Sequence, residues 1–288
     1  MDGWARFRQM RTVYGAFVEI PLGEFTMGND TPYLTLNGEL RKEHTHARQV
    51  HRVRITKRLA FLETPLSCGQ MARFLDRHPG KLAEGHFRFK VYDDIDKAYA
   101  LGDAIEHPPT RSSDVSTHAY WRAPANADLP ATGLSWEDAR RFCEVVSSEL
   151  SVRVRLPTEA EWEYVCRAGT STVFHFGADT ASVPTRAWCC VNSGLEPKVS
   201  GQFPPNPWGL YDMVGNVWEW CQDKYSTKYY GESPIDDPLC EDLTIEERVI
   251  RGGSSMNKAE TCRSSHRYGL KPGIRDRFLG FRPVIELP

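Results

Sequence analysis

The feature that most constrains the fold is a change of pattern near residue 170. Segments before this point carry helical signals. The residues after it are rich in glycine, proline, asparagine and tryptophan, which separate short extended segments. Such composition is typical of loops and short antiparallel strands. The sequence therefore predicts an α+β chain with few helices, short antiparallel strands and much irregular structure.

Three residues mark the starts of helices: Ser67, Ser135 and Thr158. Thr158 lies three residues before Glu161, which makes a T-x-x-E capping box, in which each side chain pairs with the other residue's backbone N–H. Gly169 is then a natural stop for that helix. Apolar residues follow each start at helical spacing, so we expect all three helices to be scaffold.

Strands and one long excursion complete the predicted organisation. Residues 16–30 alternate loosely and contain turn glycines, which indicates a hairpin. Residues 49–56 alternate between an apolar and an arginine-bearing face, which indicates a strand. Residues 79–131 lack clear periodicity, apart from a short helix expected near 95–101. We expect a single domain over 1–288 with a long excursion at 79–131.

Charge and apolar pattern exclude several classes of protein. The chain has 36 lysines and arginines against 38 acidic residues, so its net charge is −2. This balance argues against nucleic acid or an anionic membrane as partner. No run of about 18 apolar residues predicts a membrane span, and the first residues lack the apolar core of a secretory signal. We therefore expect a cytoplasmic protein whose eight cysteines are mostly thiols.

Several long motifs occur in one order: "RLPTEAEWEYVCRAGT", "FPPNPWGLYDMVGNVWEWCQDKY", "RGGSSMNKAETCRSSHR" and "LGFRPV". On these motifs the chain resembles the formylglycine-generating enzyme, or sulfatase-modifying factor, family. The similarity covers nearly the whole chain except residues 79–119. The resemblance implies a C-type-lectin-like fold with little regular secondary structure. Members of this family include sulfatase-modifying oxidases, modules of iron-dependent sulfoxide synthases, pyoverdine-maturation proteins and ligand-binding proteins, so the fold does not choose the function.

The oxidases of this family bind copper(I) through two cysteines that follow a GGS motif and stand five residues apart. On that pattern Cys262 matches the second cysteine, Ser254 matches the GGS serine, and Asn257 occupies the position of the first cysteine. Copper(I) prefers soft thiolate ligands, and an amide is a hard, neutral one. The copper pair is therefore incomplete, and we do not expect copper as a cofactor.

Two interpretations of Cys262 stay open. Arg263, His266 and Arg267 are close in sequence and could lower the pKa of the thiol, which would make it a nucleophile. Alternatively, Cys262 is a buried structural cysteine, since free cysteines are among the most buried residue types. We favour the second interpretation.

The stretch "DMVGNVWE" resembles a calcium loop of the family. Residue by residue, the resemblance implies side-chain oxygens from Asp212 and Glu219 and backbone carbonyls from Gly215 and Val217. Such oxygen ligands suit a hard cation, so we expect Ca²⁺ as a cofactor. The alternative is a tight loop held by hydrogen bonds from Asn216.

Three histidines, His44, His46 and His51, are close enough in sequence to suggest iron or zinc. Against this, the iron-binding histidines of the sulfoxide synthases lie mainly in a separate helical domain, for which this chain has no room. We therefore do not expect iron.

Residues 254–278 are polar with little apolar periodicity, and polar loops on a rigid scaffold suit a recognition surface. We predict a binding or accessory protein that recognises a small polar ligand, or a protein or peptide partner, through this face. The residues predicted to contact the ligand are Asn257, Arg263, His266, Arg267 and Trp218. The alternative is an enzyme, either a divergent oxidase that uses Cys262 and Ser254 or a partner-dependent nonheme iron oxidoreductase.

Overall fold

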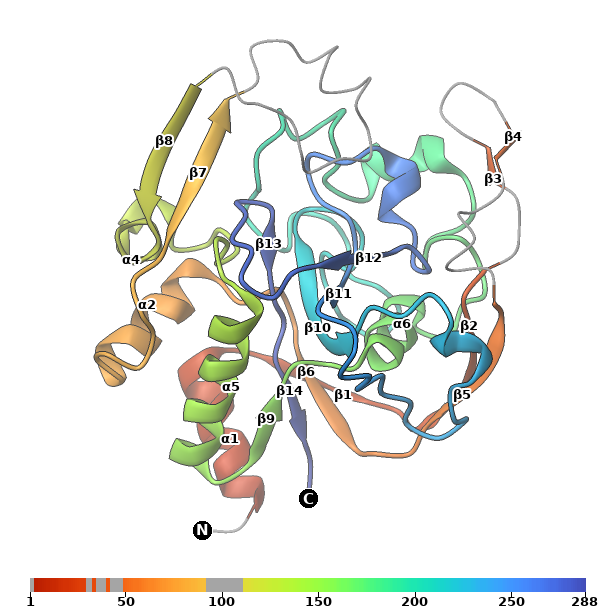
Figure 1. The fold of residues 1–288 in the computed structure, drawn as a ribbon, viewed down its shortest axis with the longest axis horizontal. Coiled ribbons are helices and arrows are strands. Elements are labelled where there is room, and N and C mark those ends of the chain that lie inside the picture. Colours follow the sequence, from red (N-terminus) through yellow and green to blue (C-terminus); the bar gives the residue numbers. More distant parts are fainter. Residues whose placement is uncertain (1–2, 30–32, 35–39, 42–48, 92–110) are drawn as a thin grey trace.

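The structure is a computed structural model that describes residues 3–29, 33–34, 40–41, 49–91 and 111–288 (Figure 1). Its helices are α1 (Gly3–Tyr14), α2 (Cys68–Arg77), α4 (Thr117–Arg122), α5 (Trp136–Leu150) and α6 (Glu159–Arg167). Short 3-10 turns are η2 (Pro124–Asn126), η3 (Thr180–Thr185), η4 (Tyr229–Gly231) and η5 (Ala259–Cys262). The strands are β1 (Phe17–Ile20), β2 (Gly23–Met27), β3 (Tyr33–Leu34), β4 (Leu40–Arg41), β5 (His51–Ile55), β6 (Leu59–Leu62), β7 (His86–Val91), β8 (Arg111–Ser116), β9 (Arg153–Arg155), β10 (Trp218–Lys224), β11 (Arg248–Arg251), β12 (Arg267–Leu270), β13 (Leu279–Gly280) and β14 (Val284–Glu286). The mixed α+β class with few helices and short strands is confirmed.

Two four-stranded sheets organise the described residues. The first sheet has the order β1-β6-β14-β9 and is antiparallel throughout. The second has the order β12-β11-β10-β13, with β10 and β13 parallel and the other pairs antiparallel. Strand β14 therefore lies inside the first sheet, between strands that precede it by long stretches of chain (Figure 1).

The three predicted helix starts are confirmed as capping boxes at Ser67, Ser135 and Thr158. Thr158 Oγ1 accepts from the backbone N–H of Glu161 at 3.1 Å, and the Glu161 carboxylate accepts from the N–H of Thr158 at 2.8 Å. Helix α6 ends where Ala168 and Gly169 turn left-handed, at φ 45° and 87°. The backbone N–H groups at the start of α6 and the C=O groups at its end are therefore satisfied by residues close in sequence.

The predicted hairpin at residues 16–30 is wrong. Strands β1 and β2 do form there, but β1 pairs with β6 and β2 pairs with β5. Pro21 and Leu22 carry the chain from one sheet to another instead of folding it back. Alternation identifies a strand by its buried face, but the partner depends on distant residues. The strand predicted at 49–56 is confirmed as β5.

The predicted excursion at 79–131 contains more regular structure than its composition suggests. Strands β7 and β8 pair antiparallel along their whole length, and α4 follows directly. Phe87 and Trp121 from this region are buried. The alternation in "HFRFKV" was the available signal for β7. The short helix expected near 95–101 lies outside the described residues.

The core consists of two hydrophobic clusters on opposite faces of β6. Ala60 and Leu62 belong to the cluster that also contains the buried faces of α2 and α5. Leu59 and Phe61 belong to the cluster that contains α6 and Cys262. Because side chains alternate along a strand, β6 is buried on both faces and connects the helical layer to the region after residue 170. Within the described ranges, every helix is too short or too polar to cross a lipid bilayer.

Candidate functional site

The candidate site is built on residues 251–267, called here the GGS segment. The chain leaves β11, turns at its two glycines, forms η5 and returns as β12. Gly253 has φ 70°, and a Cβ added to it would lie 2.7 Å from Sγ of Cys262. A larger residue would therefore push apart the two arms of the segment, so the glycine sets the position of Cys262.

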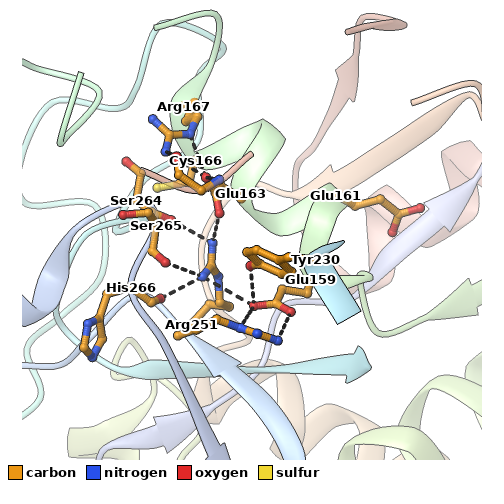
Figure 2. A network of polar contacts seen from close by, with 12 residues as sticks. Glu159, Glu161, Glu163, Cys166, Arg167, Tyr230, Arg251, Ser264, Ser265 and His266 are labelled. Carbon is orange, nitrogen blue, oxygen red and sulfur yellow. Dashed lines mark hydrogen bonds and ion pairs between the residues drawn. The ribbon is translucent and has the colours of Figure 1, made fainter. Parts of the chain in front are cut away.

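Arg251 holds the returning arm of the GGS segment from below (Figure 2). Its side chain is fully buried. The guanidinium donates to three consecutive backbone carbonyls at 2.8–2.9 Å, those of Ser264, Ser265 and His266. It also forms an ion pair with Glu163 of α6. One side chain thereby satisfies three carbonyls that no strand pairs, and ties the segment to a helix.

A second buried carboxylate, that of Glu159, lies beside the first pair, close to Tyr230 (Figure 2). Arg267 donates from Nε at 2.7 Å and from Nη2 at 2.6 Å to the two oxygens of Glu159, and the hydroxyl of Tyr230 donates to the same carboxylate at 3.0 Å. Burial by itself would raise the pKa of Glu163, but the Arg167 and Arg251 guanidinium groups hold it below its usual range. These carboxylates are structural anchors in which each buried charge has a counter-charge.

The opposite side of the GGS segment carries uncharged groups. Ser254 Oγ donates to Oδ1 of Asn257 at 2.7 Å and accepts from the backbone N–H of Met256 at 3.2 Å. The thiol of Cys262 donates to the carbonyl of Lys258 at 3.6 Å. Asn257 therefore occupies the first-cysteine position as a hydrogen-bonded amide, which offers no soft ligand to copper(I).

Cys262 has the properties of a buried structural cysteine. Its side chain is 0% exposed. Burial raises the pKa of its thiol well above 9, and negative charge on Cys189, Cys190 and Glu260 adds to the effect. Arg263, His266 and Arg267 are not among the main influences on this pKa. These features favour the structural interpretation of Cys262 over the activated thiol, because a nucleophile needs a populated thiolate.

The predicted ligand-binding residues divide by exposure. Arg263, Arg267 and Trp218 are buried, at 1%, 4% and 5% exposed. The carboxylate of Glu159 engages Arg267, and Trp218 packs its ring against the imidazole of His266 with centroids 5.7 Å apart. Asn257 and His266 are half-buried and can meet a ligand.

The recognition face predicted at 254–278 is accordingly discontinuous. Its middle part, 261–265, is buried. The accessible parts include residues 256–258, the half-buried His266, and residues 268–276, where Tyr268 and Ile274 are exposed. We call these the accessible stretches of the GGS region.

The predicted calcium ligands fit a cation only in part. The Asp212 carboxylate accepts a single backbone N–H, that of Gly201 at 2.7 Å, and burial raises its pKa to about 6. The Glu219 carboxylate already has a counter-charge, since it accepts from Arg282 at 2.9 Å and also from Trp162 at 2.8 Å. Asp212 thus suits a hard cation, whereas Glu219 is occupied.

The same loop has a structural explanation that requires no metal. Asn216 is fully buried, and its side chain accepts from the N–H of Lys198 at 2.9 Å and donates to the carbonyl of Lys198 at 3.1 Å. An added Cβ at Gly215 would lie 2.1 Å from the carbonyl oxygen of Trp188. Gly215 and Val217 thus shape a loop that is closed by hydrogen bonds.

The histidine cluster is only partly described. His44 and His46 lie outside the described residues. The Nδ1–H of His51 donates to the carbonyl of Gln49 at 2.9 Å, and the ring packs on Tyr230. In the described part of the chain, no group of three or more His, Cys, Asp or Glu side chains could hold a metal ion.

Sequence reasoning missed two features of the site. One is the set of buried ion pairs, for which the spacing of Glu159 and Glu163 on one face of α6 was the available signal. The other is the approach of the loop at Cys189 and Cys190, whose N–H from Cys190 donates to the carbonyl of Asn257 at 2.9 Å. Adjacent cysteines were visible in the sequence, but their neighbour across the fold was not.

The chain is similar in sequence to known proteins of one family. The family model described as "Sulfatase-modifying factor enzyme 1-like domain" matches residues 6–287. A formylglycine-generating enzyme of Streptomyces coelicolor is 34% identical over 187 residues, 57% of each chain. An inactive C-alpha-formylglycine-generating enzyme 2 of Bos taurus is 32% identical over 191 residues, 57% of this chain and 55% of that protein. The chain thus spans about half the length of these curated relatives.

Among solved structures, PvdO from Pseudomonas aeruginosa superposes with a TM-score of 0.69 at 26% identity, over 94% of each chain. The long match to the family model and this shared fold agree with the motifs around the GGS segment. The chain therefore belongs to the sulfatase-modifying factor family of formylglycine-generating-enzyme-like proteins.

Proposed function

We propose that this chain is a binding or accessory member of its family and not a sulfatase-modifying oxidase. The observation that carries the proposal is the state of the two positions that would form the copper pair. Asn257 is an amide engaged by Ser254, and Cys262 is a fully buried thiol whose pKa is raised. A peptide cysteine could reach neither a thiolate nor an open coordination position here.

Recognition is assigned to the accessible stretches of the GGS region. Asn257 and His266 offer an amide and an imidazole, which can both donate and accept hydrogen bonds. Tyr268 adds an exposed ring with a hydroxyl. This chemistry suits a small polar ligand or a peptide. The existence of a relative named as inactive supports a non-oxidase role within the family.

We further propose a cytoplasmic location. All eight cysteines are free in the structure, which suits a reducing compartment.

The decisive experiment is incubation of the reduced, copper-supplemented protein with a cysteine-containing sulfatase peptide. Oxygen uptake and the peptide mass are measured together. We expect no oxygen uptake beyond a protein-free control and no change in the mass of the peptide. Conversion of the cysteine by the wild type would overturn the proposal and establish the divergent oxidase.

The binding role is tested by a thermal-shift screen with free amino acids, sugars and the same sulfatase peptide. Asn257→Ala and His266→Ala are compared with Leu243→Ala, which alters an exposed residue outside residues 254–278. A compound that raises the melting temperature of wild type and Leu243→Ala, but not of Asn257→Ala, supports the assigned surface. An equal rise in all variants would place the binding site elsewhere.

A further inference from the structure

A small cavity lies where the start of α6 meets strand β5, the end of β10 and the loop that follows β10. Its volume is about 10 Å³, which is room for one group of the size of a water molecule. The side chains around it are buried except those of His51 and Tyr229, which are half-buried. The cavity is therefore reached from solvent past these two residues.

Asp223 lines this cavity as a buried carboxylate that has no cation bonded to it. Its side chain is 2% exposed. Its two oxygens accept backbone N–H groups, from Glu159 at 2.7 Å and from Cys240 at 2.9 Å. Among the described residues no ion pair involves Asp223, whereas Glu159 and Glu163 are each paired with an arginine. Since a carboxylate oxygen has two lone pairs, each oxygen of Asp223 retains the capacity to accept another hydrogen bond.

The electrostatics of the cavity favour a positively charged occupant. A second carboxylate lines it, that of Glu159, which accepts from the hydroxyl of Tyr230 (Figure 2). Burial raises the pKa of Asp223 to about 7, and the negative charge on Glu159 adds to this rise. Arg267 and Arg248 are the cations that interact with this charge, and neither forms an ion pair with it. A buried carboxylate in this situation is stabilised by a cation placed beside it.

The open side of the cavity adds an acceptor and an aromatic surface. Because the Nδ1–H of His51 donates to the carbonyl of Gln49 at 2.9 Å, the lone pair of the neutral ring is on Nε2. The imidazole packs against the ring of Tyr230 with centroids 4.8 Å apart. A buried carboxylate, an imidazole acceptor and tyrosine rings together suit a small cation that donates N–H in several directions.

We propose that this cavity binds the ammonium end of a primary amine. One N–H donates to Asp223 and another to Nε2 of His51, while the alkyl stem leaves between His51 and Tyr229. A quaternary ammonium or a guanidinium is larger than the cavity, so the site selects the primary amine. The amine belongs either to a free small molecule or to a lysine side chain of a partner protein, since both present the same head group.

This inference does not rest on the proposed function. The residues that line the cavity lie outside residues 254–278, and none of the variants that test the accessible stretches of the GGS region touches it. Amine binding without a ligand at those stretches, or the reverse, would separate the two proposals.

The test is an NMR titration of the isotope-labelled wild-type chain, followed through the N–H groups of Glu159 and Cys240, which both donate to Asp223. Butylammonium should shift both signals saturably, whereas tetramethylammonium at the same ionic strength should not. The N–H of Thr244 donates to the exposed carboxylate of Asp242 at 2.9 Å and serves as the control for general ionic effects. Signals that do not saturate, or an equal shift of the Thr244 signal, would overturn the site.

Two further compounds distinguish the sources of the amine. Nα-acetyllysine amide carries the ammonium group on a peptide-like unit, and Nα-acetylnorleucine amide lacks that group. Tighter binding of the lysine compound than of butylammonium assigns the cavity to a lysine of a partner protein, and weaker or equal binding assigns it to a free amine. Equal binding of the lysine and norleucine compounds would show that the ammonium group is not recognised, which contradicts the proposal.

Variants and pH test the roles of the two acceptors. Asp223→Asn should weaken butylammonium binding about tenfold or more, because it removes a charge-assisted hydrogen bond. His51→Ala should weaken it less, and His86→Ala, which changes an exposed histidine on β7, should bind as the wild type does.

Since the ionised form of Asp223 holds the cation, binding to the wild type should be about tenfold tighter at pH 8 than at pH 6. A proton on His51 acts in the same direction. An affinity that changes neither with pH nor in His51→Ala would overturn the site, even if Asp223→Asn fails to fold.

Discussion

The two sides of the GGS segment differ in how they are held. On one side, Arg251 and Arg267 form buried ion pairs with Glu163 and Glu159 and satisfy backbone carbonyls at short distances. On the other side, Ser254 and an amide share one hydrogen bond, and the nearby thiol makes only long contacts. The ionic side fixes the path of the backbone, whereas the neutral side carries the side chains at the two positions of the copper pair.

This difference teaches that position and chemistry are separable in this segment. The path of the GGS segment depends on carbonyls, glycines and buried arginines, none of which requires a particular residue at position 257. An amide can therefore replace a thiol there without changing the fold. A fold match consequently says little about whether a member of this family is an oxidase.

The largest expected effect comes from breaking the ionic side. Arg251→Met removes one of the two arginines paired with the buried Glu163 carboxylate, the other being Arg167, and it removes the donor to three backbone carbonyls. We expect a loss of about 3–5 kcal/mol in the free energy of unfolding, as for other buried pairs broken on one side. Chemical denaturation of wild type and variant measures this loss.

The matched change on the neutral side is Asn257→Ala, which removes one hydrogen bond at a half-buried position. It should cost about 0.5–1.5 kcal/mol. Arg52→Met, which removes an exposed ion pair with Glu24, serves as the surface control. Equal losses in Arg251→Met and Asn257→Ala would show that the two sides are not distinct.

An intermediate effect is expected at Asp212, which lacks the counter-charge that Glu219 has. Its pKa of about 6 in the folded protein exceeds the ordinary value of 3.8. The folded state therefore binds the proton more tightly than the unfolded state, and stability falls as pH rises from about 4 to 6. Asp212→Asn should abolish this fall and stabilise the metal-free protein at pH 8 by about 1–3 kcal/mol.

Calcium should reverse the order of these two proteins. If Ca²⁺ binds the folded state through Asp212, it raises the melting temperature of wild type and leaves Asp212→Asn unchanged. The measurement is a pair of melting curves in calcium and in chelator. A wild-type melting temperature that does not respond to the chelator would exclude the calcium site and leave the Asn216-closed loop as the explanation.

The smallest expected effect tests the scaffold that carries the ionic side. Thr158→Ala removes the N-cap of α6, the helix on which Glu159 and Glu163 stand. It should cost about 1 kcal/mol. Ligand binding should be unaffected, and exposed Thr227→Ala should leave stability unchanged. A Thr158→Ala protein as stable as wild type would mean that the buried ion pairs, not the cap, determine where α6 begins.

Local chemistry explains which parts of the fold were predictable. The capping boxes at Ser135 and Thr158 involve residues three apart, so the sequence contains both partners. The strand pairing of β1 with β6 joins residues 39 to 45 positions apart, and no local pattern encodes it. The same limit hid the pairing of β7 with β8, whose connection is long.

The site follows the same division. The replacement at Asn257 was evident from spacing, because the motif is local. The burial of Cys262 was also predictable, because free cysteines are commonly buried. The burial of Arg263 was not, since it depends on packing between distant parts of the chain. Charged residues near a cysteine in sequence can point away from it in space, as Arg267 does toward Glu159.

The inner position of β14 has a consequence for biosynthesis. A ribosome adds about 5–20 residues per second. Strand β6 is therefore translated on the order of ten seconds or more before β14, its neighbour in the sheet. During that interval the first sheet lacks an inner strand, and its neighbours β6 and β9 present open edges. Open edges recruit strands from other chains. The nascent protein therefore passes through a period of exposure to aggregation that ends only after residues 284–286 have been made, and a chain truncated before Val284 would keep these edges open.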